Sequence, residues 1–151
     1  MTGTIVLQDS AADAVYSWVW TGGDGEVCLS TDSTYAWGSA VTAGLTFVPD
    51  VDTVFGLGSA SDNAANTFTT ADCDLTLDGI TAISDTANVT TAGGWDTCLV
   101  KDAGNTTEDN FAFCVNMDSK AAYDDSTANY QVMVPTTPGG IETYYFYAEL
   151  N

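Results

Sequence analysis

Histidine and arginine are absent from this chain of 151 residues, and lysine occurs only at Lys101 and Lys120. Without histidine, no serine or cysteine triad can be built around an imidazole base. Without arginine, no guanidinium can clamp a phosphate or an oxyanion, and no glycine-rich phosphate loop is present. Paired carboxylates of the kind that glycosidases use arise by chance among many acidic residues. We therefore expect a protein that is not an enzyme.

The shortage of basic side chains leaves the chain strongly acidic. Seventeen Asp and four Glu residues give a formal net charge of −19 at pH 7. Nucleic acids and anionic membrane surfaces are bound through clustered Lys and Arg, so both are excluded as partners. No segment approaches the roughly 18 consecutive apolar residues of a membrane span. An alternative source of the charge is adaptation of the surface for solubility.

Residues that favour helix interiors are scarce, whereas Asp, Thr, Gly and Asn, which favour turns and caps, are abundant. Short apolar segments recur between turn residues along the whole chain. This pattern predicts an all-β fold: one antiparallel β-sandwich domain over 1–151, Ig-like or jelly-roll-like, with about ten short strands. The expected strands cover 3–8, 14–20, 26–31, 34–41, 45–58 (an edge strand, or a break at Pro49), 66–79, 80–85, 87–92, 95–100, 110–117 and a terminal hairpin over 129–151, with a loop or short helical turn at 121–129.

The four cysteines, Cys28, Cys73, Cys98 and Cys114, show no C-x-x-C spacing. Because a zinc site without histidine would need four scattered thiolates, two disulfides in an oxidising compartment fit better. Cys98 and Cys114 lie almost symmetrically about the polar turn 101–110, and a hairpin would place them face to face. We predict the pairs Cys98–Cys114 and Cys28–Cys73, with four free buried thiols as the alternative.

Clustered carboxylates supply the hard oxygen ligands that calcium prefers. Asp72, Asp74 and Asp78 lie in one stretch, "DCDLTLDG", and are a candidate calcium site, although their spacing is not that of an EF-hand loop. Divalent ions would also relieve self-repulsion between copies of an acidic chain. In a chain with this charge, such clusters also arise without any metal.

Asn88 and Asn105 each begin an N-x-Thr triplet and are candidate glycosylation sites, with Asn105 in an expected exposed turn. Trp18, Trp20, Trp37 and Trp95 are numerous for this length. Aromatic rings on a solvent-facing sheet bind sugars, but tryptophans at alternating strand positions more often belong to the core. Two or more coplanar exposed rings would favour polysaccharide binding.

The last segment, "YQVMVPTTPGGIETYYFYAEL", predicts a β-hairpin at residues 130–150. Pro135 holds Val134 in an extended conformation, and Pro138-Gly139 is typical of a type II turn. The segment resembles the closing hairpin of Ig-like β-sandwich modules in secreted bacterial and archaeal surface and appendage proteins. The resemblance implies a cell-surface setting and no enzymatic site.

The comparison with immunoglobulin domains is poorer. Cys28 followed by Trp37 is similar to their cysteine–tryptophan core, but Ala112 stands where a tyrosine would precede the second cysteine. This difference argues against an immunoglobulin-type Cys28–Cys114 bond.

Both ends of the chain carry strands that are apolar on two faces, in 14–20 and in 141–150. In a closed domain they would be central strands. Alternatively, one of them completes the sheet of the next subunit, and such contacts propagate into a filament. We therefore predict that the protein is extracellular and is a structural subunit of a pilus-like filament or surface layer. Its copies would bind one another by terminal strand complementation. The alternative is a monomeric carbohydrate-binding or adhesive module. The predicted interface residues are Val15, Trp18, Trp20, Tyr145, Phe146 and Tyr147.

Overall fold

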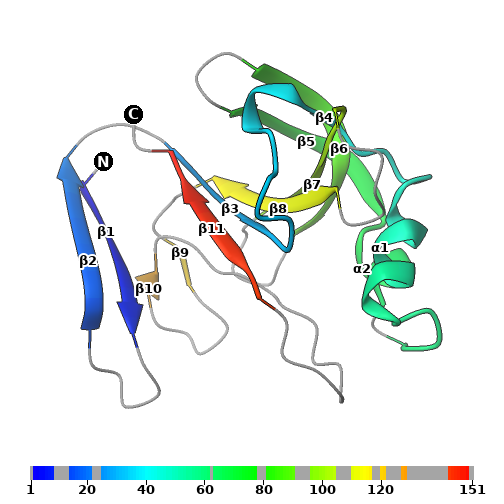
Figure 1. The fold of residues 1–151 in the computed structure, drawn as a ribbon, viewed down its shortest axis with the longest axis horizontal. Helices are drawn as coiled ribbons and strands as arrows, with labels where there is room; N and C mark the ends of the chain where they lie inside the picture. The colour runs from blue at the N-terminus through cyan, green and yellow to red at the C-terminus, as the bar shows by residue number, and fades with distance from the viewer. Residues whose placement is uncertain are drawn as a thin grey trace.

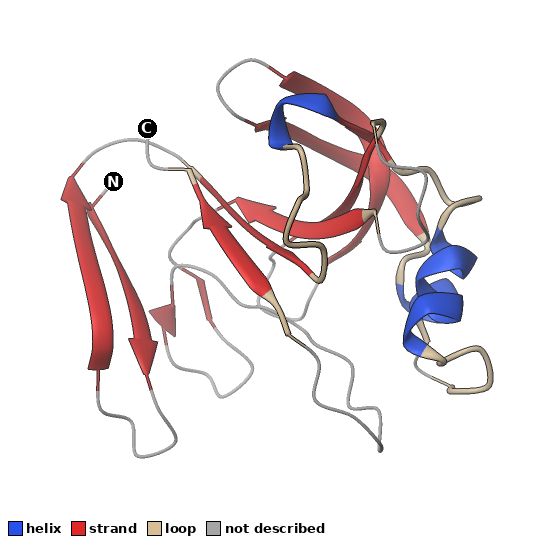
Figure 2. Ribbon diagram, viewed as in Figure 1, coloured by secondary structure: helices blue, strands red, loops and turns tan. Residues whose placement is uncertain are grey.

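The computed structural model describes residues 2–8, 14–21, 25–61, 63–77, 81–90, 96–104, 110–116, 120–121, 127–128 and 143–149. The protein is mostly β, with two short helices (Figures 1 and 2). The elements are β1 (Thr2–Gln8), β2 (Ala14–Thr21), β3 (Glu26–Ser30), the 3₁₀ turn η1 (Trp37–Ser39), β4 (Ala40–Thr42), α1 (Val48–Phe55), α2 (Ala64–Thr67), β5 (Thr70–Leu77), β6 (Thr81–Thr90), β7 (Asp96–Asp102), β8 (Phe111–Asn116), β9 (Lys120–Ala121), β10 (Thr127–Ala128) and β11 (Tyr145–Ala148).

Seven strands form one antiparallel sheet in the order β11-β3-β8-β7-β6-β5, with β4 paired to β7. The sheet is not closed into a barrel. The strand pairs β1–β2 and β9–β10 each form a separate two-stranded sheet, and the β1–β2 hairpin stands apart from the seven-stranded sheet in Figure 1. The antiparallel β prediction is therefore confirmed in its coarse form, and the structure adds two short helices that the prediction did not include.

The core lies on both faces of the sheet. One cluster contains all four cysteines together with Tyr35, Leu75 and Leu77, and the other places α1 and α2 against the opposite face. β3 is buried along its whole length, as a central strand covered on two sides should be. Aromatic rings dominate the helical side, where five of the six phenylalanines contact one another: Phe47, Phe55, Phe68, Phe111 and Phe113.

Helix α1 occupies a segment for which the sequence predicted a strand with a break at Pro49. Pro49 lies in the first helical turn, where its missing N–H is not needed, and Gly56 ends the helix with φ 67°. Val48 and Val51, three residues apart, are both buried on the inner face of the helix. The β-branched composition of the segment concealed these helix signals.

β6 is one continuous strand, although the sequence suggested two. Asp85 adopts φ 53°, a left-handed conformation that Asp tolerates better than most residues, within a strand of ten residues. Its partner β5 has register shifts on both sides of Cys73. Bulges of this kind bend a strand, and here the bend brings β5 back towards β7.

The predicted pairing of the cysteines was wrong, although the expectation of two disulfides is confirmed. The bonds are Cys28–Cys114 and Cys73–Cys98. The β7–β8 hairpin does place Cys98 opposite Cys114, but β3 places Cys28 opposite Cys114 on the other side. The Cα atoms of Cys28 and Cys114 are 4.1 Å apart, close to the spacing of a non-hydrogen-bonded antiparallel pair.

Cys73 reaches Cys98 because the sheet curls. These residues lie in β5 and β7, which are separated by β6. In a flat sheet the separation would be roughly 9.6 Å, twice the usual strand spacing. Their Cα atoms are 6.0 Å apart. Since Cys73 is thereby bonded, no thiol remains for the predicted bond to Cys28.

Candidate functional site

The outer edge of β11 is the candidate site. β11 pairs with β3 on one side only, and no other strand within the described residues pairs with it (Figure 1). The bond from Glu149 N to Glu26 O is 2.9 Å long. Because hydrogen-bonded and non-hydrogen-bonded pairs alternate along an antiparallel ladder, Tyr147 and Tyr145 bond to β3, whereas the N–H and C=O groups of Phe146 and Ala148 point to the outer edge.

The side chains of β11 differ in how far their own domain covers them. Phe146 is 53% exposed and Tyr145 is 44% exposed. Among the described residues from 25 onward, these are two of three exposed large apolar residues; the third is Leu45, at 44%. The strand was expected to be covered on both faces, and the structure leaves both faces partly open to water.

The ring of Tyr147, in contrast, packs against its own domain. It stacks on Trp37 with ring centroids 4.4 Å apart and an interplanar angle of 16°. Trp37 in turn contacts Tyr35 at 4.4 Å with the rings tilted by 42°. Because Trp37 and Tyr147 cover each other face to face, they do not form the coplanar, exposed platform that sugar binding requires.

Tyr35 anchors this aromatic stack in the core. Its hydroxyl is buried and has no hydrogen-bond partner within the described residues. Burial raises the pKa of Tyr35 well above its usual value, and the negative charges of Asp102 and Asp32 raise it further. The phenol therefore stays protonated at any physiological pH and cannot act as a base.

Asp102 organises the loop that carries Trp37. Its carboxylate accepts hydrogen bonds from Ala36 N (3.1 Å), Ser39 Oγ (2.7 Å) and Gly104 N (2.7 Å). This network was not predicted. The bond to Gly104 has a sequence signal, since an Asp two residues before a Gly is typical of an Asx turn. The bonds across 63 and 66 residues of sequence have none.

The opposite edge of the sheet, β5, is very different. Its residues alternate between buried Cys73, Leu75 and Leu77 and exposed positions. Asp72 and Asp74 occupy two of the exposed positions. Exposed charge and bulges are two devices that prevent an edge strand from pairing with another molecule, and β5 has both.

The N-terminal part of the predicted interface lies in the β1–β2 hairpin. Val15, Trp18 and Trp20 belong to β2, and Trp18 is paired in register with Ile5 of β1. The strands contain seven and eight residues, and neither contains a charged residue. The first strand of the predicted terminal hairpin, with Val134, Pro135 and the Pro138-Gly139 turn, lies outside the described residues.

The candidate calcium ligands do not converge in the described structure. Asp72 and Asp74 point outward from β5, where Asp74 Oδ1 accepts a hydrogen bond from Asp85 N (3.1 Å), and Asp78 lies outside the described residues. Within the described ranges, no group of three Asp, Glu, Cys or His side chains is arranged to hold a metal ion.

Of the two candidate glycosylation sites, Asn88 is 2% exposed. Its Oδ1 accepts hydrogen bonds from Thr70 Oγ1 (2.9 Å) and Asp72 N (3.2 Å). A side chain held in this way is not accessible on the folded protein. Asn105 and Trp95 lie outside the described residues.

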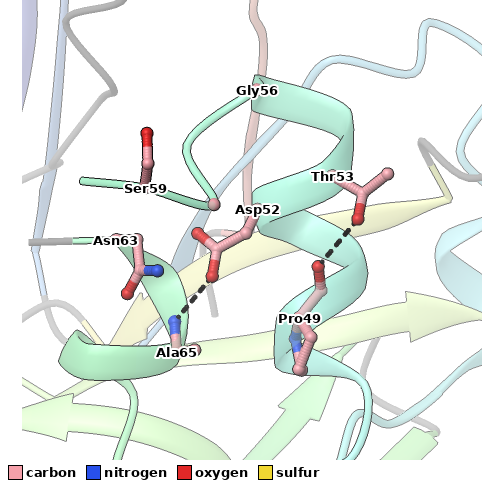
Figure 3. Close-up of a pocket in the computed structure, with 8 residues that line it drawn as sticks. Pro49, Asp52, Thr53, Gly56, Ser59, Asn63 and Ala65 are labelled. Carbon is pink, nitrogen blue, oxygen red and sulfur yellow. Dashed lines mark hydrogen bonds between the residues drawn. The ribbon is translucent and has the colours of Figure 1, made fainter.

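An open pocket of about 460 Å³ lies between α1 and α2 (Figure 3). Its buried carboxylate, Asp52, is fully engaged: Oδ1 accepts from Ala64 N (2.6 Å) and Oδ2 accepts from Ala65 N (3.0 Å). Asn63 caps the same helix through a bond from Asn66 N (2.9 Å). Asp52 and Asn63 thus hold α2 in place, and Thr53 Oγ1 donates to Pro49 O (3.1 Å) within α1.

Comparisons with family models, with curated proteins and with solved structures find no match to this chain. No helix within the described residues is long and apolar enough to cross a lipid bilayer. The two disulfides indicate folding in an oxidising environment, extracellular or periplasmic.

Proposed function

We propose that this chain is a structural subunit of an extracellular filament or surface layer, and that its copies join by β-strand addition at the outer edge of β11. The asymmetry between the two sheet edges carries the proposal. β5 is protected by charge and bulges, whereas β11 is uncharged, and no described strand pairs with its outer main-chain groups beside Tyr145 and Phe146. An added strand would gain main-chain hydrogen bonds and would bury both aromatic rings.

The acidic character of the chain strengthens the argument. A net charge of −19 opposes close approach of copies, because like charges repel at any contact where they meet. Contact is least unfavourable where the surface carries no charge, as at β11. The resemblance of residues 130–150 to surface and appendage modules supports the cell-surface setting. The predicted β-sandwich belongs to this proposal, as a second sheet packed face to face on the seven-stranded sheet.

A main-chain substitution tests strand addition most directly. Ala148→Pro removes an N–H that points to the outer edge and leaves the ladder to β3 intact, because proline is tolerated at such edge positions. Ala148→Ser keeps the N–H and is the matched control. In size-exclusion chromatography and negative-stain microscopy, we expect wild type and Ala148→Ser to form assemblies and Ala148→Pro to remain a monomer. The near-UV circular dichroism of Ala148→Pro should be unchanged, because its fold is intact.

Side-chain variants test the apolar contribution of the same edge. Phe146→Asp should abolish assembly. Leu45→Asp is the control, because it introduces the same charge at another exposed apolar side chain, and it should leave assembly unchanged. A wild-type protein that remains a monodisperse monomer at every concentration would overturn the proposal. Retention of that monomer on a polysaccharide matrix would favour a carbohydrate-binding module instead.

A further inference from the structure

We infer that the N-terminal hairpin β1–β2 of one copy is the element that adds to the outer edge of β11 in the next copy. This inference rests on the function proposed above and names the donor. Among the described strands, β1 and β2 pair only with each other. An isolated two-stranded hairpin is marginally stable in water, so it gains by joining a larger sheet.

The absence of charge makes the hairpin compatible with β11. The chain has 21 acidic residues, yet none lies in β1, β2 or β11. The acidic residues nearest to the hairpin strands in sequence, Asp9 and Asp13, lie between the strands rather than within them. Pairing of β1 or β2 with β11 therefore brings no like charges face to face, which would cost stability in a cross-strand pair.

Length and connection also fit. β11 has four residues, and β1 and β2 have seven and eight, so either hairpin strand can cover the whole open ladder. The link between Thr21 and Glu26 reads Gly-Gly-Asp-Gly. Glycine adopts a wide range of backbone angles, so three glycines in four residues place little restriction by sequence on how a hairpin joins β3.

The contact is heterologous, because a hairpin on one copy meets a sheet edge on another. An assembly of any length then keeps one free hairpin at one end and one free edge at the other, so the contact repeats into a filament rather than closing as a symmetric dimer. Pairing of β11 with β11 of a second copy would instead be isologous and would stop at two chains.

A mixing experiment with full-length variants distinguishes these arrangements. Trp18→Asp combined with Trp20→Asp disables the hairpin as donor, and Ala148→Pro disables the edge as acceptor. Each variant alone should remain a monomer by light scattering. An equimolar mixture should form a 1:1 heterodimer and nothing larger, because only one intact hairpin and one intact edge can meet. Ala11→Asp with Ala12→Asp adds the same charge between the hairpin strands and should assemble like wild type.

If the Trp18→Asp/Trp20→Asp variant assembled alone, the inference would be overturned but the proposed function would stand. A mixture that stayed monomeric would have the same consequence. A monomeric wild type would overturn both. Hydrogen exchange on assembled wild type is independent of how the variants fold. We expect new protection of the Phe146 and Ala148 amides together with the amides of β1 or β2; protection at β11 without the hairpin would contradict the inference.

Discussion

At its β5 end the seven-stranded sheet curls, carries two bulges and exposes aspartates, while at its β11 end it stops with a short, uncharged strand and two exposed aromatic rings. The two edges belong to one chain and one sheet, so a difference in solvent or in overall charge does not explain the contrast. A protein that needed only solubility would protect both edges. The difference teaches that the two edges are built differently: β5 carries exposed charge and bulges, whereas β11 is short and carries exposed aromatic rings.

The phenylalanines repeat this contrast. Five of the six gather beneath α1 and α2, and the sixth, Phe146, is 53% exposed at the open edge. The same residue type therefore serves the interior of the domain at one place and its outer surface at another.

The largest expected effect comes from the disulfides, of which one joins β3 to β8 and the other joins β5 to β7. Cys28→Ala with Cys114→Ala removes a bond that spans 86 residues of sequence, and Cys73→Ala with Cys98→Ala removes one that spans 25. Chain entropy alone gives losses in the free energy of unfolding of about 4.6 and about 3.5 kcal/mol. Urea unfolding of the oxidised proteins measures both. If the Cys73–Cys98 pair gave the greater loss in the free energy of unfolding, chain entropy would not account for it. The curl at the β5 end would then depend on that covalent bond.

A pair of phenylalanine substitutions compares the closed side with the open edge. Phe111 is 1% exposed, and Phe111→Ala should lower the free energy of unfolding by about 3–5 kcal/mol. Phe146→Ala should change it by less than about 0.5 kcal/mol when measured on dilute monomer. Similar losses for the two variants would mean that Phe146 belongs to the core and would remove the contrast.

The buried carboxylate between the helices should have an intermediate effect. Asp52→Ala leaves the N–H groups of Ala64 and Ala65 without their acceptor and should cost about 1–3 kcal/mol. Asp50→Ala, at an exposed position in the first turn of α1, should cost less than about 1 kcal/mol. Thermal unfolding of both variants checks the difference, and equal losses would assign Asp52 no special role.

The smallest expected effect concerns Tyr35 and appears at high pH. Burial, assisted by Asp102 and Asp32, raises the pKa of Tyr35 in the folded protein. Above about pH 10 the unfolded chain loses this proton and the folded chain keeps it, so the free energy of unfolding falls as pH rises. In Tyr35→Phe, the free energy of unfolding should fall less steeply with pH, by about 1.4 kcal/mol per pH unit. Denaturant unfolding at pH 10 and 11 measures the slope, and an unchanged slope would show that Tyr35 ionises in the folded state.

Much of the sheet could be predicted because its strands carry their own local signals. Alternating apolar residues bounded by turn residues located β1, β2, β3, β7 and β8 within a few positions. The β7–β8 hairpin was located by its polar turn, and the register of Cys98 with Cys114 followed from it. Each of these features depends on residues that are close together in sequence.

The features that were missed depend on long-range contacts or on competing local signals. Cys114 lies between two cysteines, and only the position of β3 beside β8 decides that Cys28 is its partner. Asp52 meets α2 across 12 and 13 residues, and Trp37 meets Tyr147 from a distant part of the chain. In α1, Pro49 and Gly56 mark the two ends of the helix, but the valines between them favoured a strand, so the sequence predicted a strand there.

The Cys28–Cys114 bond has a mechanical consequence. In an assembly joined at β11, tension would enter each subunit through β11 and pass to β3, which is the only described strand bonded to it. From β3 the load reaches β8 through a covalent bond as well as through hydrogen bonds. Within each subunit, rupture under shear would then begin at the β11–β3 ladder rather than deeper in the sheet, so a stretched subunit would release β11 before β3 separates from β8.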